Sequence, residues 1–261
     1  MILNGFLKSI AKLNQLPINK LPISDCSLYE TIKEREYFSN GVVTKEQSCT
    51  EHQGEWLFYP GMLFGSCDKW WADWGTRYTP HEGLDITFYR KKIDDAIRSD
   101  NSSCGCDILS FDSSVVIPAM FDGTVLNICK DFLGQSVVIR HQALNQVLSN
   151  NRNSCCNSYS YCDSNIGSIG NLTIKDDKDS EIVFVYSHIL AENGLNVGQM
   201  VKKGQIIGNV ADTSMRKSGI PSHLHISIAE VLTKIAFADL NWELFADPTC
   251  DSVCFFDPMR I

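Results

Sequence analysis

The sequence predicts a mainly β protein with an antiparallel sheet as its core, preceded by a short amphipathic helix. From about residue 114 the chain becomes a series of short runs rich in β-branched and aromatic residues, which is typical of strands. Asp122-Gly123 lies between the first two runs, and glycine supplies the positive φ that a tight hairpin needs. The runs are SSVVIPAM, GTVLNIC, GQSVVIRH, EIVFVYSHI, GQIIGNVA and HLHISIAEV.

The N-terminal helix is expected to end before Pro17. Its apolar side chains recur at helical spacing with two lysines between them; they are Leu3, Phe6, Leu7, Ile10 and Leu13. A second helical stretch is expected from Ser27 to Tyr37, because Ser27 and Glu30 are spaced as a capping box. We therefore interpret residues 1–60 as a helical accessory segment.

The remaining chain divides into a central domain over 61–233 and a C-terminal extension over 234–261, with a short helix expected from Asn241 to Phe245. Two stretches inside the central domain are too long and too polar for ordinary connections in a compact sheet. Residues 91–112 and 143–180 are therefore predicted to be cysteine-bearing loop insertions.

Charge and hydropathy exclude two kinds of partner. The chain has 23 basic and 31 acidic side chains, a net charge of −8 and a pI near 5.2. Nucleic-acid binders draw much of their affinity from clustered lysine and arginine, so no nucleic-acid partner is expected. No stretch approaches the length of apolar sequence that a transmembrane helix needs, so no membrane span is expected.

The eleven cysteines indicate an oxidising compartment, because cytosolic enzymes seldom carry so many. Disulfides are favoured over a cysteine zinc site, since no pair of Cys-x2-Cys steps occurs. The spacing of Cys250 and Cys254 allows a local disulfide, and the other pairings stay open. No signal peptide is visible in this chain, because it shows neither an uninterrupted apolar region nor a small-residue cleavage site.

Four of the six histidines fall in three short motifs. In His223-Leu-His225 the two imidazoles project from one face of a predicted strand. In His81-Glu-Gly-Leu-Asp85 a straight strand would hold the outer Cα atoms roughly 13 Å apart, so sharing an ion requires a bend, which Gly83 permits. Two imidazoles and one carboxylate suit a catalytic Zn²⁺ that keeps its fourth position for water.

These motifs resemble, in content and order, those of the LytM/lysostaphin-type zinc endopeptidases, which cut peptidoglycan peptides. His81-x-Gly83-x-Asp85 is similar to the family's opening ligand motif. Later family blocks are similar to VIPAMFDGTVLNI, GQSVVIRH, VYSHIL, VGQMVKKGQIIGNVADT and SGIPSHLHI. The resemblance covers roughly residues 75–230 and implies the family's duplicated hybrid motif fold, an antiparallel β-sheet.

The resemblance also implies a role for each site residue. His81, Asp85 and His225 would bind Zn²⁺, while His188 and His223 would act as catalytic residues that face the water and the scissile carbonyl. We favour His223 as the general base and His188 as the hydrogen-bond donor to the developing oxyanion, although the two roles could be exchanged. After the His-Leu-His motif the family usually has an aromatic and then an acidic residue, whereas Ile226 and Ser227 stand here, so a supporting acid must come from elsewhere.

The implied function is hydrolysis of peptide bonds in peptidoglycan stem or cross-bridge peptides, in the periplasm, the cell envelope or the extracellular space. Two alternatives remain: a non-enzymatic LytM-like module that binds the cell wall or activates amidases, and a metallopeptidase that acts on other proteins. Retention of all five polar site residues favours an enzyme. The sequence leaves the oligomeric state open.

Further side chains are weaker candidates. Residues 1–60 could occlude the groove, as preceding segments do in some relatives, with an asparagine or His52 as an additional ligand. His52 and His141 belong to no motif and are otherwise interpreted as structural. Candidates for binding glycan rings, for lining the groove or for holding a substrate carboxylate are Trp70, Trp71, Trp74, Tyr186 and Arg77, although at least two of the tryptophans are expected to pack in the core.

Overall fold

The computed structural model describes residues 2–16, 55–71, 75–92, 106–141, 180–214, 216, 219–247, 250 and 252–260. The predicted helix at 27–37, His52, Trp74 and almost all of the 143–180 insertion lie outside the described residues. Among the described residues no helix has both the length and the apolar character needed to cross a bilayer.

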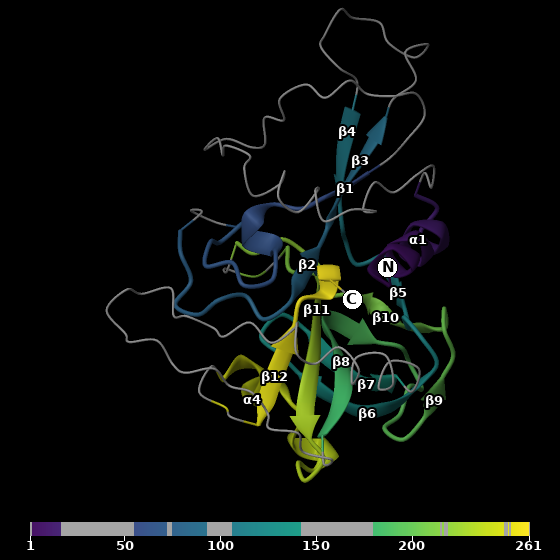
Figure 1. Ribbon diagram of the computed structural model, residues 1–261. Helices are drawn as coiled ribbons and strands as arrows, with labels where there is room; N and C mark the ends of the chain where they lie inside the picture. The colour runs from purple at the N-terminus through teal and green to yellow at the C-terminus, as the bar shows by residue number, and fades with distance from the viewer. Residues whose placement is uncertain are drawn as a thin grey trace, which may run out of the picture.

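A nine-stranded antiparallel sheet forms the centre of the described structure (Figure 1). Its main path runs β12-β11-β8-β7-β6-β9, while β10 pairs with β5 and β8, and β2 pairs with β11. Each of the six predicted runs contains one of these strands, so the predicted mainly β fold is confirmed. The strands are β2 (Leu84–Ile86), β5 (Val116–Pro118), β6 (Gly123–Lys130), β7 (Gln135–His141), β8 (Ser180–Ala191), β9 (Met200–Val201), β10 (Ile206–Val210), β11 (Leu224–Leu232) and β12 (Val253–Phe256).

The central strand β8 is buried on both faces, and its side chains alternate between two hydrophobic clusters. Phe184 and Tyr186 join the cluster that includes α1, whereas Val183 and Val185 join a second cluster with Phe245 of the C-terminal extension. This alternation follows from the two-residue repeat of a strand. The C-terminal extension therefore covers one face of the same sheet that α1 covers on the other.

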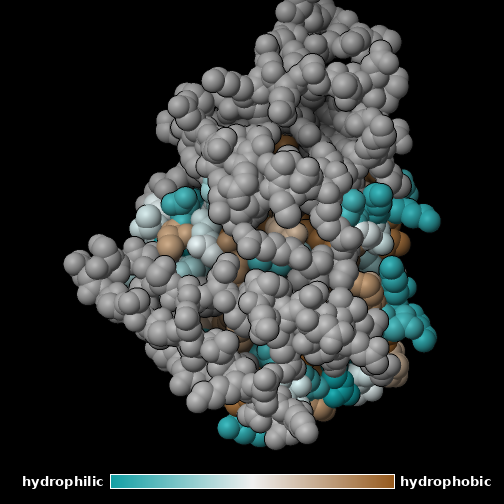
Figure 2. All heavy atoms as spheres, in the orientation of Figure 1, coloured by the Kyte–Doolittle hydropathy of each residue, from teal (hydrophilic) through white to brown (hydrophobic). Residues whose placement is uncertain are grey.

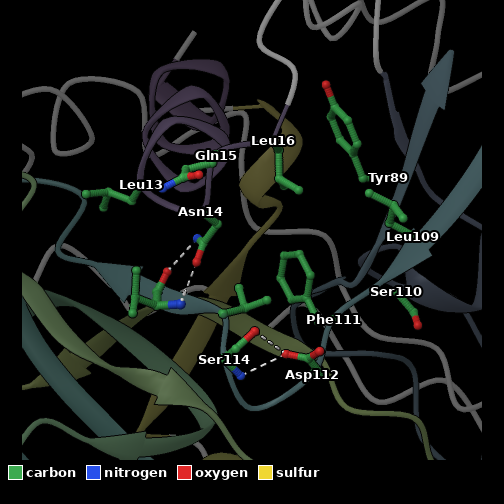
Figure 3. Close-up of a pocket in the computed structure, with 12 residues that line it drawn as sticks. Leu13, Asn14, Gln15, Leu16, Tyr89, Leu109, Ser110, Phe111, Asp112 and Ser114 are labelled. Carbon is green, nitrogen blue, oxygen red and sulfur yellow. Dashed lines mark hydrogen bonds between the residues drawn. The ribbon is translucent and has the colours of Figure 1, made fainter. Parts of the chain in front are cut away.

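Helix α1 (Ile2–Leu13) forms where the sequence predicts it. Its apolar face is buried in the first cluster, whereas Lys8 and Lys12 are exposed. Figure 2 shows hydrophilic side chains along the edge of the molecule where α1 and β9 lie in Figure 1. Just after the helix, the amide of Asn14 donates to the Val116 carbonyl at 3.0 Å and accepts from its N–H at 2.8 Å (Figure 3). The side chain thus fixes the helix end to β5.

A second, three-stranded sheet lies above the main sheet in Figure 1, in the order β1-β3-β4. Its strands are β1 (Glu55–Leu57), β3 (Phe88–Lys92) and β4 (Cys106–Ser110). The prediction of a loop over 91–112 is therefore incomplete, because both ends of this stretch pair as antiparallel strands. The pairing of β3 with β1 is a tertiary contact, which the polar local sequence does not reveal.

The C-terminal extension contributes α4 (Trp242–Ala246), close to the predicted position, and β12, which the sequence analysis missed. Asn241 caps the helix by accepting a hydrogen bond from the Leu244 N–H at 3.1 Å. Cys250 carries a free thiol, so the local disulfide that its spacing from Cys254 allows is not formed, whereas Cys67 is disulfide-bonded. Short 3-10 helices span Pro60–Met62, Phe237–Asp239 and Pro258–Arg260.

Candidate functional site

Three neighbouring strands assemble the site. Strand β2 pairs with β11 so that Asp85 lies opposite His225, and β11 pairs with β8 so that His225 lies opposite Ser187. His188 follows Ser187, and His223 immediately precedes β11. All five predicted site residues are therefore brought to one place by the register of this sheet.

His81, Asp85 and His225 place one ligand atom each in a tight triangle. Nε2 of His81 lies 3.0 Å from Nδ1 of His225, Oδ1 of Asp85 lies 3.2 Å from His81 Nε2, and it lies 2.8 Å from His225 Nδ1. Tetrahedral zinc with bonds of about 2.05 Å would separate its ligand atoms by about 3.3 Å. All three side chains are buried. The cluster therefore fits a small tetrahedral cation after a slight expansion.

The chain bends at Gly83, as the spacing of His81 and Asp85 requires. A Cβ atom on Gly83 would lie 2.5 Å from the Ile226 carbonyl oxygen and 2.7 Å from the His225 ring. Such distances are closer than packed atoms tolerate. The close approach of β11, together with the bend, therefore explains why a glycine is needed here. The φ angle of Gly83 is not positive, so a left-handed backbone is not the reason.

Each of the three residues is also held from outside the triangle. Nδ1 of His81 donates to the Leu63 carbonyl at 3.2 Å, and Nε1 of Trp70 donates to Oδ2 of Asp85 at 2.6 Å. Nε2 of His225 lies 2.8 Å from Oγ of Ser227. Such outer contacts orient metal ligands and fix their tautomers. Ser227 thus supports His225 at the position where the resemblance led us to expect an acid.

Electrostatics keep Asp85 in the ionised form that binds a cation. Burial alone would raise the pKa of Asp85, but the charges of His81 and His223 and hydrogen bonds from His225 and His81 hold it well below its usual value. Burial lowers the pKa of His81. For His225, burial acts in the same direction, but the hydrogen bond and charge of Asp85 outweigh it and raise the pKa. An ionised carboxylate is the form that binds metal.

His223 lies beside the triangle with its second nitrogen fixed. Its Nδ1 donates to the Pro221 carbonyl at 2.8 Å, and its Nε2 lies 3.6 Å from Oδ1 of Asp85. Burial lowers the pKa of His223 to about 3, against the opposing charge of Asp85. At neutral pH the imidazole is therefore uncharged, and Nε2 carries the lone pair that can accept a proton.

His188 is held by a residue that the sequence analysis missed. Its backbone has a positive φ of 63°, which is uncommon for a residue other than glycine. The His188 N–H donates to Oδ2 of Asp131 at 2.9 Å, and the His188 Nδ1 lies 3.1 Å from Oδ1 of the same carboxylate. The Asp131-Phe-Leu-Gly134 stretch reads locally as a turn, which gives no sign of a contact 57 residues away.

The site opens into a small cavity of about 60 Å³. Aromatic residues line its mouth: Trp71, Phe132 and Trp242. The ring centroids of Trp242 and His188 are 5.3 Å apart, so the C-terminal extension completes the wall, a role that the sequence did not suggest. None of the described residues before Trp71 lines this cavity.

Two of the weaker candidates, Tyr186 and Arg77, make contacts that support the fold. Tyr186 is completely buried, where its hydroxyl accepts from the Met120 N–H at 3.0 Å and lies 2.9 Å from His141 Nε2. It therefore lies in the core and not in the groove, and His141 is structural as predicted. Arg77 donates to the carbonyl oxygens of Gly61 and Asp68, so its guanidinium supports the loop before the site.

Antiparallel strands that carry a buried His-Asp-His triangle, with two further imidazoles beside it, are consistent with a LytM-like fold and form a site suited to a metallohydrolase. The family model described as Peptidase family M23 matches residues 159–236. This match includes His188, His223 and His225, and it confirms the resemblance to LytM-type peptidases.

One solved structure is also similar to the chain, the structure of Helicobacter pylori Csd3 from the orthorhombic crystal. It shares 20% sequence identity with a TM-score of 0.28, over 72% of this chain and 35% of that chain. This chain thus spans about a third of Csd3. No curated protein sequence matches the chain. The M23 family match is therefore the comparison that indicates a peptidase.

Proposed function

We propose that the protein is a zinc-dependent endopeptidase that hydrolyses peptide bonds in peptidoglycan stem or cross-bridge peptides. The observation that carries the proposal is the triangle of His81 Nε2, Asp85 Oδ1 and His225 Nδ1, whose sides measure 2.8 to 3.2 Å. The M23 match supports the peptidase class. The resemblance to wall-cutting enzymes supports the choice of substrate.

In this proposal the triangle holds Zn²⁺, which supplies Lewis-acid chemistry by polarising a carbonyl and making water more acidic. Uncharged His223 takes the proton of the attacking water at Nε2. His188 donates a hydrogen bond to the oxygen on which negative charge develops. The two histidines lie beside each other with ring centroids 4.8 Å apart, so both reach the same reacting group.

The substrate would enter past the aromatic mouth of the cavity. Trp71, Phe132 and Trp242 offer flat apolar surfaces that can flank a peptide backbone. Because peptidoglycan lies outside the cytoplasm, we also place the protein in the periplasm, the cell envelope or the extracellular space, a location that fits its cysteine content. The same location favours disulfides among the remaining cysteines.

Metal content and digestion of purified sacculi test the proposal together. We expect about one zinc per chain, release of peptide fragments from sacculi, loss of both after chelation, and recovery of both when zinc is restored. Zinc binding with cleavage of unrelated proteins but not of sacculi would indicate a different substrate. Zinc binding without any cleavage would indicate a binding module, and no zinc uptake would exclude the proposal.

The contact between Trp70 and Asp85 gives a finer prediction. Trp70→Phe removes the N–H donor to Asp85 but keeps an aromatic ring, so zinc affinity should fall about 10- to 100-fold, measured by competition with a chelating dye. Trp56→Phe is the matched control, because Trp56 is equally buried and its Nε1 has no partner among the described residues. Equal losses in both variants would contradict a role for this hydrogen bond.

A further inference from the structure

We propose that Asp131 is a positioning residue that holds the His188 imidazole in one orientation and one tautomer, with Nε2 directed at the reacting atoms. The inference rests on the proposed function, since it concerns the same reaction. It gives a function to Asp131, which lies in a turn outside the three histidine motifs.

The first support is how completely the Asp131 carboxylate is engaged. Its side chain is fully shielded from solvent. Oδ1 accepts from the N–H groups of Leu133 at 2.8 Å and Gly134 at 2.6 Å, and Oδ2 accepts from the Ser136 hydroxyl at 2.9 Å. These contacts fix the carboxylate within its own turn. The two contacts with His188 are therefore made by a carboxylate whose orientation is already fixed.

The second support is the protonation of the pair. Burial would raise the pKa of Asp131, but the hydrogen bond and charge of His188 and the backbone N–H groups hold it below its usual value. An ionised carboxylate can only accept hydrogen bonds. Nδ1 of His188 lies 3.1 Å from Oδ1, at an angle outside ordinary hydrogen-bond geometry. A proton on this nitrogen is the arrangement that the ionised carboxylate favours, and it leaves Nε2 for the cavity.

The third support is the backbone of His188. A left-handed conformation persists at a residue with a side chain only where its surroundings hold it. Asp131 accepts the His188 N–H, and the hydroxyl oxygens of Ser136 and Ser187 lie 2.8 Å apart. The pairing of β7 with β8 shifts register between Gln135 and Val137, beside these contacts. The turn thus redirects His188 out of the regular alternation of β8 and into the cavity.

His188 and His223 differ in the group that faces their Nδ1 atoms. The Nδ1 of His223 donates to a neutral carbonyl, whereas the Nδ1 of His188 faces an anion. A buried carboxylate behind an imidazole orients it and stabilises positive charge on it, as in the catalytic triad of serine proteases. The tautomer that Asp131 favours leaves a lone pair on Nε2, and the carboxylate stabilises the imidazolium that forms when Nε2 takes up a proton during the reaction; in that form Nε2 donates to the developing oxyanion.

The test is Asp131→Asn, which keeps the size of the side chain but removes its charge. The ring tautomer of His188 is measured first, in zinc-free protein, from two-bond proton–nitrogen correlations that are assigned by their loss in His188→Gln. We expect a protonated Nδ1 in the wild type and a shift towards protonated Nε2 in Asp131→Asn. This readout needs no activity, so it tests the inference even if the protein cleaves nothing.

Kinetics form the second readout. With zinc content unchanged, kcat of Asp131→Asn should fall about 10²-fold or more, by analogy with the larger loss for the triad aspartate, while KM stays close to the wild-type value. Asp112→Asn is the matched control, because Asp112 also accepts from the N–H and hydroxyl of a residue in its own turn, Ser114, but contacts no histidine among the described residues. It should leave both constants unchanged.

If Asp131→Asn does not fold, Ser136→Ala replaces it, because it removes one contact to the carboxylate and leaves the charge in place. A smaller fall in kcat, with the tautomer kept because the carboxylate remains, would support the inference. A wild-type tautomer together with a wild-type kcat would overturn it, and so would a rise in KM with kcat unchanged. Absence of cleavage by the wild type would instead count against the proposed function.

Discussion

Asp85→Ala is expected to abolish zinc binding and peptide cleavage together. Asp85 is the one anion in the triangle, and its Oδ1 lies within 3.2 Å of both ligand nitrogens. Without it, two neutral imidazoles would have to hold a doubly charged ion in a buried site. Loss of an outer contact alone weakens metal binding about 10- to 100-fold, so loss of a direct ligand should exceed about 100-fold. Zinc per chain after gel filtration, measured beside sacculus digestion, checks this.

Folding must be separated from metal binding in this experiment. Asp85 accepts a hydrogen bond from buried Trp70, so alanine also leaves that N–H without its partner, at a cost of about 1–3 kcal/mol. Asp85→Asn keeps an acceptor for Trp70 and removes only the charge. A folded Asp85→Asn protein that still binds zinc as tightly as the wild type would show that the triangle is not the metal site.

His223→Ala is expected to keep its zinc and lose its turnover. His223 contacts the triangle only through the 3.6 Å approach of Nε2 to Asp85, so its removal leaves the three ligand atoms in place. A general base contributes about 10²- to 10⁴-fold to the rate, and kcat should fall by that factor. Zinc content and the melting temperature, measured on the same preparation, should stay near the wild-type values.

His141→Gln provides the control for a buried histidine outside the site. His141 contacts the Tyr186 hydroxyl and lies between aromatic rings of the core, so its replacement should lower stability without changing kcat per folded molecule. A wild-type kcat in His223→Ala would reassign the general base, and His188 would then be the remaining candidate. Loss of zinc from His223→Ala would instead make this residue a ligand.

The histidine motifs were predictable because their information is local. Two-residue alternation places both imidazoles of His223-Leu-His225 on one side of β11, and the structure buries Leu224 in the core on the other side. The need for a bend between His81 and Asp85 followed from the rise of a strand, and the bend is at Gly83. Strand positions after residue 114 were predictable for the same reason.

Contacts between distant strands were not predictable in this way. Asp131 reaches His188 only because β7 and β8 pair with a register shift, and register depends on the whole sheet. Trp242 reaches the site only because the C-terminal extension folds back along the sheet. The short apolar sequence of β12 carries no signal of its partner, since its pairing with β11 is a tertiary choice.

The wide spacing of the three triangle residues determines when the proposed metal site can form during synthesis. His225 lies 144 residues after His81 and 140 residues after Asp85. After His81 and Asp85 have been synthesised, most strands of the sheet must therefore follow before His225 is added to the chain. The ordering cost of joining such distant segments must be met by the packing of β8 against β11. The proposed hydrolytic capacity would consequently appear only after His225 has been synthesised and β11 has paired with β8, and no fragment that ends before His225 should retain it.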